Sequence, residues 1–105
     1  MFKVNEYFNG KVKSLAFTDN KQDATIGVMA PGEYEFATSC REYMTVISGE
    51  LTVLLPGAKE WQKFGPGHTF IVEPDQKFQL KANADTSYIC RYEKVGCSCQ
   101  NCQCN

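Results

Sequence analysis

The sequence predicts an all-β protein folded as a single barrel or sandwich. Eight short runs rich in β-branched and aromatic residues alternate with turn residues, at the spacing of roughly 8 to 12 residues that is typical of such folds. No window of the chain shows the helical period of an amphipathic helix. The chain has 105 residues, which is enough for one domain and too few for two.

The predicted strands are bounded by turn chemistry such as Pro31-Gly32, Ser48-Gly49 and Pro74-Asp75. In chain order they are Val12–Phe17, Thr25–Met29, Tyr34–Thr38, Tyr43–Ser48, Leu51–Leu55, Thr69–Val72, Lys77–Ala82 and Ser87–Tyr92. We assign residues 1–93 to one domain. Residues 94–105 form a Cys-rich tail with almost nothing to pack, which we expect to be mobile.

The segment from Glu42 to Ser48 carries apolar residues on both of its faces. Such a strand is covered on both sides, either by a second sheet of the same monomer or by another subunit. Both readings stay open, and the second predicts a homodimer.

Composition and charge limit the partners. A net charge of −1 gives no electrostatic footprint for nucleic acid or for an anionic membrane. Residues 1–10 lack the uninterrupted apolar run of a signal peptide, and no stretch reaches the length of a membrane span. Of the six cysteines only Cys40 and Cys90 lie in the body of the domain, which argues against a disulfide framework. We expect a cytoplasmic protein whose partner is a small molecule.

Glu42 and Gly49 stand seven positions apart, after a Pro-Gly turn. This spacing resembles the first motif of the cupins, which fold as a jelly-roll β-barrel, and so predicts a single cupin-type barrel. Metal-dependent cupins place two histidines before that glutamate and a third in a second motif. Here the corresponding positions hold Phe36, Thr38 and Gln79.

A transition-metal site needs three or four imidazole, carboxylate or thiolate ligands. Glu42 alone remains, so we expect a barrel interior without metal. The only histidine, His68, follows a Gly-Pro-Gly turn, where it could act as a general acid or base or simply be solvated.

Several stretches resemble one family of small bacterial cupins, the pyrimidine/purine nucleoside phosphorylases. They occur in the family's order and cover nearly all of residues 3–92. The matching stretches are Asn5–Phe8, Gly10–Ser14, Gly27–Met29, Gly32–Tyr34, Glu42 with Met44–Gly49, Leu54–Pro56, Trp61-Gln62, Thr86–Tyr88 and Cys90–Tyr92.

The resemblance implies a pentosyltransferase of broad specificity. Such an enzyme cleaves purine and pyrimidine nucleosides with orthophosphate, giving the free base and ribose 1-phosphate. It implies no cofactor beyond orthophosphate as co-substrate. The reaction passes through an oxocarbenium-like ribosyl group and needs groups that bind phosphate and the ribose hydroxyls.

Four residues are candidates for this chemistry. The guanidinium of Arg91 suits bidentate phosphate contacts, although Arg91 could equally be a surface arginine. Glu42 could bind ribose hydroxyls and offset developing positive charge, or form a structural pair with a barrel arginine such as Arg91. Thr38 and Gln79 could offer neutral hydrogen bonds in the cavity or be satisfied core groups.

Broad base tolerance suggests that the base is held by stacking, because every base has a π-face. By strand alternation the candidates are Phe36, Tyr34, Phe78 and Tyr43. Core packing is the competing explanation for each of them.

Two other functions stay open. A non-catalytic cupin could bind a sugar or a nucleotide in the same pocket. Alternatively, Cys97, Cys99, Cys102 and Cys104 could form a soft-metal clamp or redox tail on a structural barrel.

Overall fold

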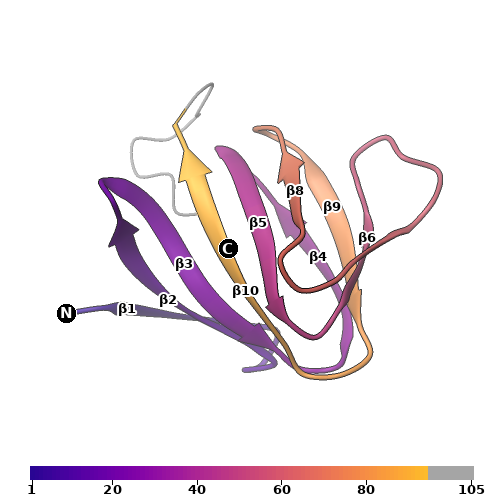
Figure 1. Cartoon of the computed structure of the whole chain (residues 1–105), viewed down its shortest axis with the longest axis horizontal. Helices are drawn as coiled ribbons and strands as arrows, with labels where there is room; N and C mark the ends of the chain where they lie inside the picture. The colour runs from indigo at the N-terminus through magenta and orange to yellow at the C-terminus, as the bar shows by residue number, and fades with distance from the viewer. Residues whose placement is uncertain (95–105) are drawn as a thin grey trace.

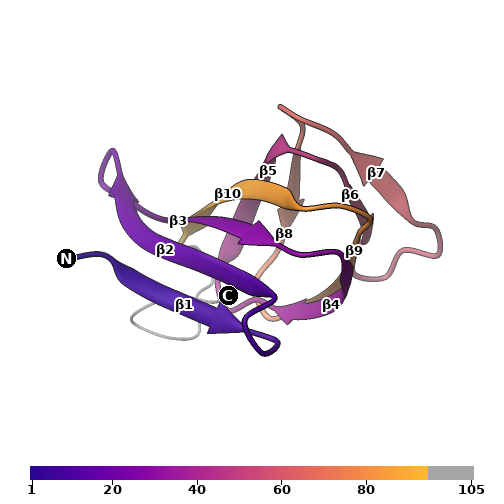
Figure 2. The ribbon, with the colours of Figure 1, turned by 90° about the horizontal axis from the view of Figure 1, so that it is seen from below.

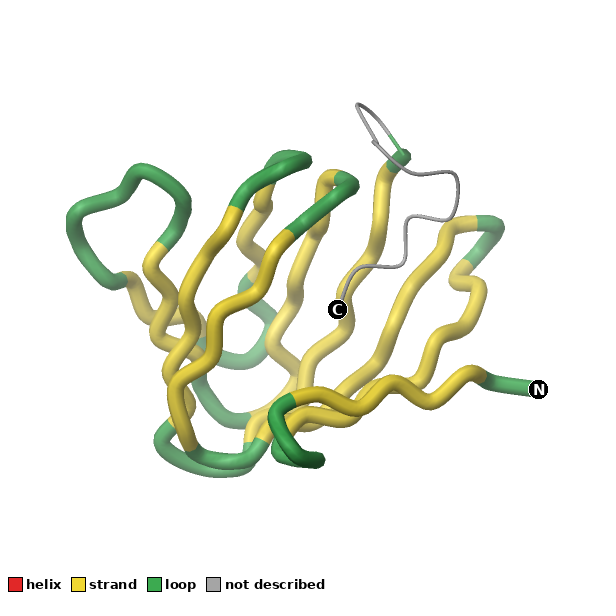
Figure 3. Tube along the Cα trace, turned by 180° about the vertical axis from the view of Figure 1, so that it is seen from behind, coloured by secondary structure: helices red, strands yellow, loops and turns green. Residues whose placement is uncertain are grey.

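The structure is a computed structural model that describes residues 1–94 of the chain. These residues form ten strands and no helix (Figure 1, Figure 3), and none of their elements is a helix that could span a membrane. The strands are β1 Lys3–Tyr7, β2 Val12–Asp19, β3 Gln22–Met29, β4 Gly32–Ala37, β5 Arg41–Ser48, β6 Leu51–Leu54, β7 Gln62–Phe64, β8 Thr69–Val72, β9 Lys77–Ala82 and β10 Thr86–Glu93.

The strands form two antiparallel sheets that face each other. The larger has six strands in the order β1-β2-β3-β10-β5-β8, and the smaller has four in the order β4-β9-β6-β7. Figure 2 shows β1 and β2 reaching out beyond the smaller sheet. One apolar core is shared by residues of both sheets, which confirms the predicted all-β cupin-type architecture.

All eight predicted strands are present, and β8 and β9 have the predicted bounds. Strands β1 and β7 were not predicted. Most residues of β1 are exposed, and β7 is three residues long with only Phe64 partly buried. Neither strand therefore shows the alternation of apolar and polar residues on which sequence-based assignment depends.

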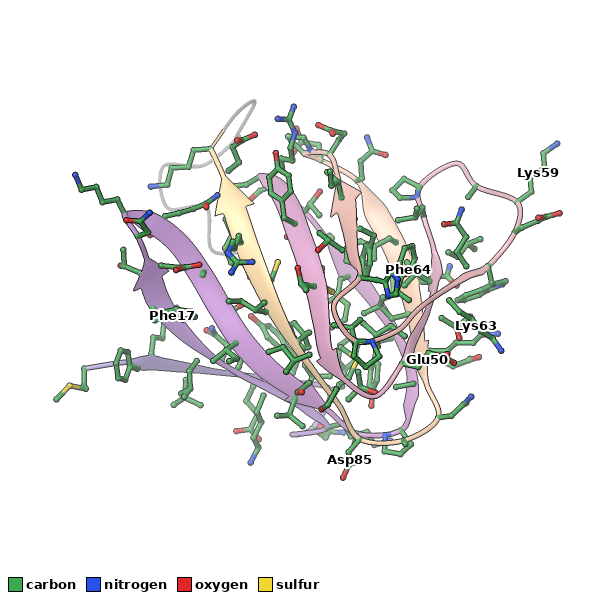
Figure 4. All side chains as sticks on the ribbon, viewed as in Figure 1. Phe17, Glu50, Lys59, Lys63, Phe64 and Asp85 are labelled. Atoms are coloured by element: carbon green, nitrogen blue, oxygen red, sulfur yellow. The ribbon has the colours of Figure 1, made fainter. Side chains whose placement is uncertain are left out.

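The space between the sheets is filled by side chains from alternate strand positions. On β5, Glu42, Met44 and Val46 point inward and are at most 2% exposed, whereas Tyr43 and Thr45 on the opposite face are half-buried. The phenyl rings of Phe64 and Phe70 pack 4.9 Å apart, and Figure 4 shows Phe64 directed toward the barrel.

Two glycines are required by close approaches. Gly49 follows β5 with a φ of +84°, and a Cβ there would lie 2.5 Å from Thr86 Oγ1 and 2.9 Å from the Asp85 carbonyl oxygen. On β3, a Cβ at Gly27 would lie 2.6 Å from the Cζ and hydroxyl oxygen of Tyr88. Gly49 thus permits the turn into β6, and Gly27 leaves room for the Tyr88 ring.

Candidate functional site

Glu42 lies on the inner face of β5 and is fully buried. It is the only charged residue among the buried residues of the part of the chain that the structure describes. Burying a carboxylate costs free energy that a core of apolar residues would avoid. A carboxyl group retained at such a position makes Glu42 the leading candidate for a functional group inside the barrel.

Polar side chains of β10 lie beside Glu42, and one of them is bonded to Thr25 on β3. Tyr92 is its cross-strand partner on β10, and Cys90 lies two residues earlier on the same face. The Cys90 thiol donates a hydrogen bond to Glu42 Oε1 at 3.4 Å. Thr25 on β3 shares a hydrogen bond of 2.9 Å with the Tyr92 hydroxyl. Every member of this group, the Glu42 cluster, is at most 2% exposed.

The electrostatics of the interior disfavour any further negative charge. Burial is the main cause that raises the pKa of Tyr92, and the nearby Cys90 and Glu42 groups add to it. Burial likewise raises the pKa of Tyr88, with smaller contributions from Cys90 and Glu42 among others. Both phenols therefore remain protonated hydrogen-bond donors over the physiological pH range.

Arg91 and Glu42 lie on opposite faces of the six-stranded sheet. Arg91 alternates with the inward-facing Cys90 and Tyr92 on β10 and is half-buried on the outer face. Its Nε donates to Asp19 Oδ2 at 2.7 Å. The suggested structural pair between Glu42 and Arg91 is therefore wrong, because β10 itself separates the two side chains.

Thr38 lies where the second sheet meets the turn between β8 and β9. Its hydroxyl donates to the Glu73 carbonyl oxygen at 2.7 Å and accepts from the Gln76 amide at 3.0 Å. The Thr38 hydroxyl is therefore already hydrogen-bonded to backbone groups. Gln79 points outward from β9 and is exposed, so the structure does not place it in the interior with Glu42.

Three of the aromatic candidates are core residues. Tyr34, Phe36 and Phe78 are at most 5% exposed, and the rings of Phe36 and Phe78 lie 6.0 Å apart. The Tyr34 hydroxyl donates to the Ala30 carbonyl oxygen at 2.6 Å, and burial raises the pKa of this phenol. Tyr43 faces outward instead and donates to Glu93 Oε1 at 3.1 Å.

The residues at the cupin ligand positions do not fit a metal ion. Phe36 has no ligand atom, Thr38 is bonded to backbone, and Gln79 faces outward. Within residues 1–94 no group of three or more His, Cys, Asp or Glu side chains could hold an ion. His68 is exposed, with Nδ1 3.3 Å from the Gly65 carbonyl oxygen. The tail cysteines, Cys97 to Cys104, lie outside the described residues.

A hollow of about 250 Å³ lies near the end of β10 and includes Tyr92 in its wall. The amide of Gln22 donates to the Tyr92 carbonyl oxygen at 3.2 Å. Lys21 and Lys94 also line the hollow, and the Lys94 ammonium lies 3.4 Å from Asp23 Oδ2. Asp23 and Glu93 also line the hollow, so its two ammonium groups face two carboxylates.

Sequence reasoning missed Thr25, Tyr88, Cys90 and Tyr92 as neighbours of Glu42. The alternation of Thr86, Tyr88, Cys90 and Tyr92 could have placed the last three on one face of their strand. Pairing that face with Glu42 required the register between β5 and β10.

The paired antiparallel sheets and the inward-facing motif glutamate define a cupin barrel. The structure resembles an RmlC-like cupin from Shewanella frigidimarina with a TM-score of 0.71 at 16% identity, covering 90% of this chain and 86% of that one. It resembles a protein of unknown function from Vibrio parahaemolyticus more closely, with a TM-score of 0.85 at 43% identity, covering 89% of this chain and 99% of that one.

The family model for pyrimidine/purine nucleoside phosphorylase matches residues 2–92. A relative of that name from Pseudomonas entomophila is 61% identical over 92 residues, covering 88% of this chain and 98% of the relative. Another from Alcanivorax borkumensis is 62% identical over the same length and coverage. The chain belongs to the pyrimidine/purine nucleoside phosphorylase family.

Proposed function

We propose that the protein cleaves purine and pyrimidine nucleosides with orthophosphate. The bond between the base nitrogen and C1′ breaks with its electron pair going to the base, which is protonated. A phosphate oxygen then bonds to C1′ to give the pentose 1-phosphate. The observation that carries this proposal is the identity of about 60% to curated nucleoside phosphorylases over nearly their whole length.

Glu42 is our choice for stabilising the ribosyl group during the reaction. As the C1′–N bond breaks, positive charge develops on the sugar, and a fixed carboxylate in a water-poor interior stabilises such charge strongly. Support for this role comes from the burial of Glu42 and from its polar neighbours Cys90 and Tyr92.

Arg91 is our candidate for attracting phosphate to the outer face of β10, and not for holding it against C1′, because the sheet separates Arg91 from Glu42. A matched pair of variants tests the part played by Arg91. Arg91→Ala should raise the phosphate KM, because it removes binding present in the ground state. Asp19→Asn releases the guanidinium from its 2.7 Å ion pair and should lower the phosphate KM. A change in the same direction for both variants would show that the ion pair serves only structure.

The reaction itself is tested by incubating the purified full chain with inosine or uridine, with and without orthophosphate. We expect free base to appear only when phosphate is present, together with an equal amount of pentose 1-phosphate. Base release without phosphate would identify a hydrolase instead. Binding without release under any condition would identify the non-catalytic sugar- or nucleotide-binding cupin.

We also propose that the protein is a homodimer that pairs through the outer face of the six-stranded sheet. This face carries an apolar surface, the outer patch, that includes a hollow of about 570 Å³. Its large residues are 41 to 60% exposed, a degree of exposure that single monomers rarely tolerate in one contiguous area. They are Val4, Leu15, Ile26, Val28 and Ile47.

A second copy is the occupant that best suits the outer patch. The patch lies on a broad sheet, and the same apolar surface on a two-fold-related copy would complement it. Ile26→Glu should therefore give a monomer in light scattering coupled to size-exclusion chromatography. Thr52→Glu on the outer face of the four-stranded sheet is the control and should leave the dimer intact. A wild-type protein that is monomeric at micromolar concentration would refute the proposal.

A further inference from the structure

The outer face of the four-stranded sheet carries a hollow of about 480 Å³, the Trp61 hollow. Its polar lining comes from β4, β9 and the chain between β6 and β7, namely Glu33, Glu35, Trp61, Gln79 and Lys81. The loop that leads to Trp61 stands away from the barrel (Figure 1), and Lys59 points outward from it (Figure 4). The hollow is on the sheet opposite the outer patch, so a dimer formed through that patch leaves it open.

The side chains of the hollow hold one another in place. The Lys81 ammonium lies 4.1 Å from the centroid of the Trp61 ring and 3.4 Å from Glu33 Oε1. The strand register places Lys81 beside Glu33, because Lys81 pairs with Glu33 on β4 and with Thr52 on β6. The cation–π contact orients the indole, which remains 36% exposed. The aromatic surface is therefore positioned before any ligand arrives.

The chemistry of the lining selects a class of ligand. The part of the indole that Lys81 leaves uncovered offers a stacking surface for a planar base. The carboxylates of Glu33 and Glu35 accept hydrogen bonds from hydroxyl groups, and the Gln79 amide can both donate and accept. Two carboxylates against one ammonium leave the lining negative, which disfavours phosphate-bearing ligands.

We propose that the Trp61 hollow is a nucleoside-binding site outside the barrel. The base stacks on Trp61, and the ribose hydroxyls donate to Glu33 and Glu35. The site is separate from the Glu42 cluster, because its polar residues alternate along β4 and β9 with inward-facing core residues. The choice of nucleosides as ligands rests on the proposed function, whereas the preference for an uncharged ligand rests on the lining alone.

Trp61 is the only tryptophan in the chain, so its fluorescence reports on this site directly. The full-length protein is titrated in phosphate-free buffer with uridine, uridine monophosphate and ribose. We expect uridine to quench the emission saturably, uridine monophosphate to bind more weakly, and ribose to have no effect at the same concentrations. An emission that uridine leaves unchanged, or tighter binding of the monophosphate, would overturn the proposal.

Variants separate this site from the reaction site. By isothermal titration calorimetry, Trp61→Leu should bind uridine roughly 5- to 150-fold more weakly, the loss expected for one stacked base. Glu35→Gln should also bind more weakly and keep the native far-ultraviolet circular dichroism spectrum, whereas Glu50→Gln, an exposed control, should bind normally. Glu42→Gln should keep the fluorescence response even where phosphorolysis is lost. A response lost in Glu42→Gln but kept in Glu35→Gln would overturn the proposal, whatever the outcome of the phosphorolysis assay.

Discussion

Glu42→Gln is the substitution that most directly tests the chemistry assigned to the barrel. It keeps the size of the side chain and removes the only carboxyl group among the buried residues of positions 1–94. Loss of a preorganised electrostatic contact typically costs about 100- to 1,000-fold in turnover, or roughly 3 to 4 kcal/mol of transition-state stabilisation. We expect kcat for uridine to fall by about that factor, with little change in the phosphate KM.

Stability should respond in a different way from activity. A buried carboxylate pays a desolvation penalty that an amide of the same shape largely avoids. The free energy of unfolding of Glu42→Gln at pH 7 should therefore be equal to or above that of the wild type, as measured by urea denaturation. Such a loss of turnover without a loss of stability is characteristic of a functional charge.

Initial rates of base release and urea denaturation curves are measured for the wild type and for Glu42→Gln, so that the loss of turnover can be compared with the change in stability. Glu50→Gln, an exposed carboxylate on the turn after β5 (Figure 4), is the matched control and should resemble the wild type in both assays. Retention of turnover within about threefold in Glu42→Gln would refute the electrostatic role, since the expected loss is far larger. Equal losses of turnover and stability would show that Glu42 serves packing.

Other predictions follow from the core and from the ligand positions. Gly27→Ala should lower the free energy of unfolding by about 1 to 3 kcal/mol, because its Cβ would meet the Tyr88 ring. Gly65→Ala, with no atom within 4 Å of the new Cβ, should leave the free energy of unfolding nearly unchanged. Equal destabilisation by the two substitutions would show that a clash with Tyr88 is not the cause. Stability should fall as the pH rises above about 10, because Tyr88 and Tyr92 ionise there only when unfolded; absorbance titration showing native-state ionisation of all tyrosines at that pH would refute this. EDTA should leave phosphorolysis unchanged, and inhibition reversed by zinc or manganese would contradict the metal-free interior.

Most of the fold could be predicted from the local sequence pattern. Strands with one buried face have an alternation that is visible in the sequence, and the positions of all eight such strands were predicted. Strands β1 and β7 were not predicted, because none of their residues is fully buried. The strand pattern together with the spacing of Glu42 and Gly49 predicted the barrel.

The site was harder to predict, because a site depends on which faces of different strands meet. Alternation shows that Arg91 and Tyr92 face opposite ways, but not which of them faces Glu42. The register that pairs Tyr92 with Glu42 arises from tertiary packing across 50 residues of chain. For the same reason, Gln79 was expected in the cavity although it lies on the outer surface.

Gly49 has a consequence for how barrels of this type are recognised. Its left-handed backbone and its contact with Thr86 are needed by the turn, whether or not a metal is present. The glutamate-to-glycine spacing is therefore a marker of chain geometry, while histidines at the vacated positions are a marker of metal chemistry. A search that demands both features will find only the metalloproteins, and relaxing the histidine requirement should recover barrels in which a single buried carboxylate has been kept for other chemistry.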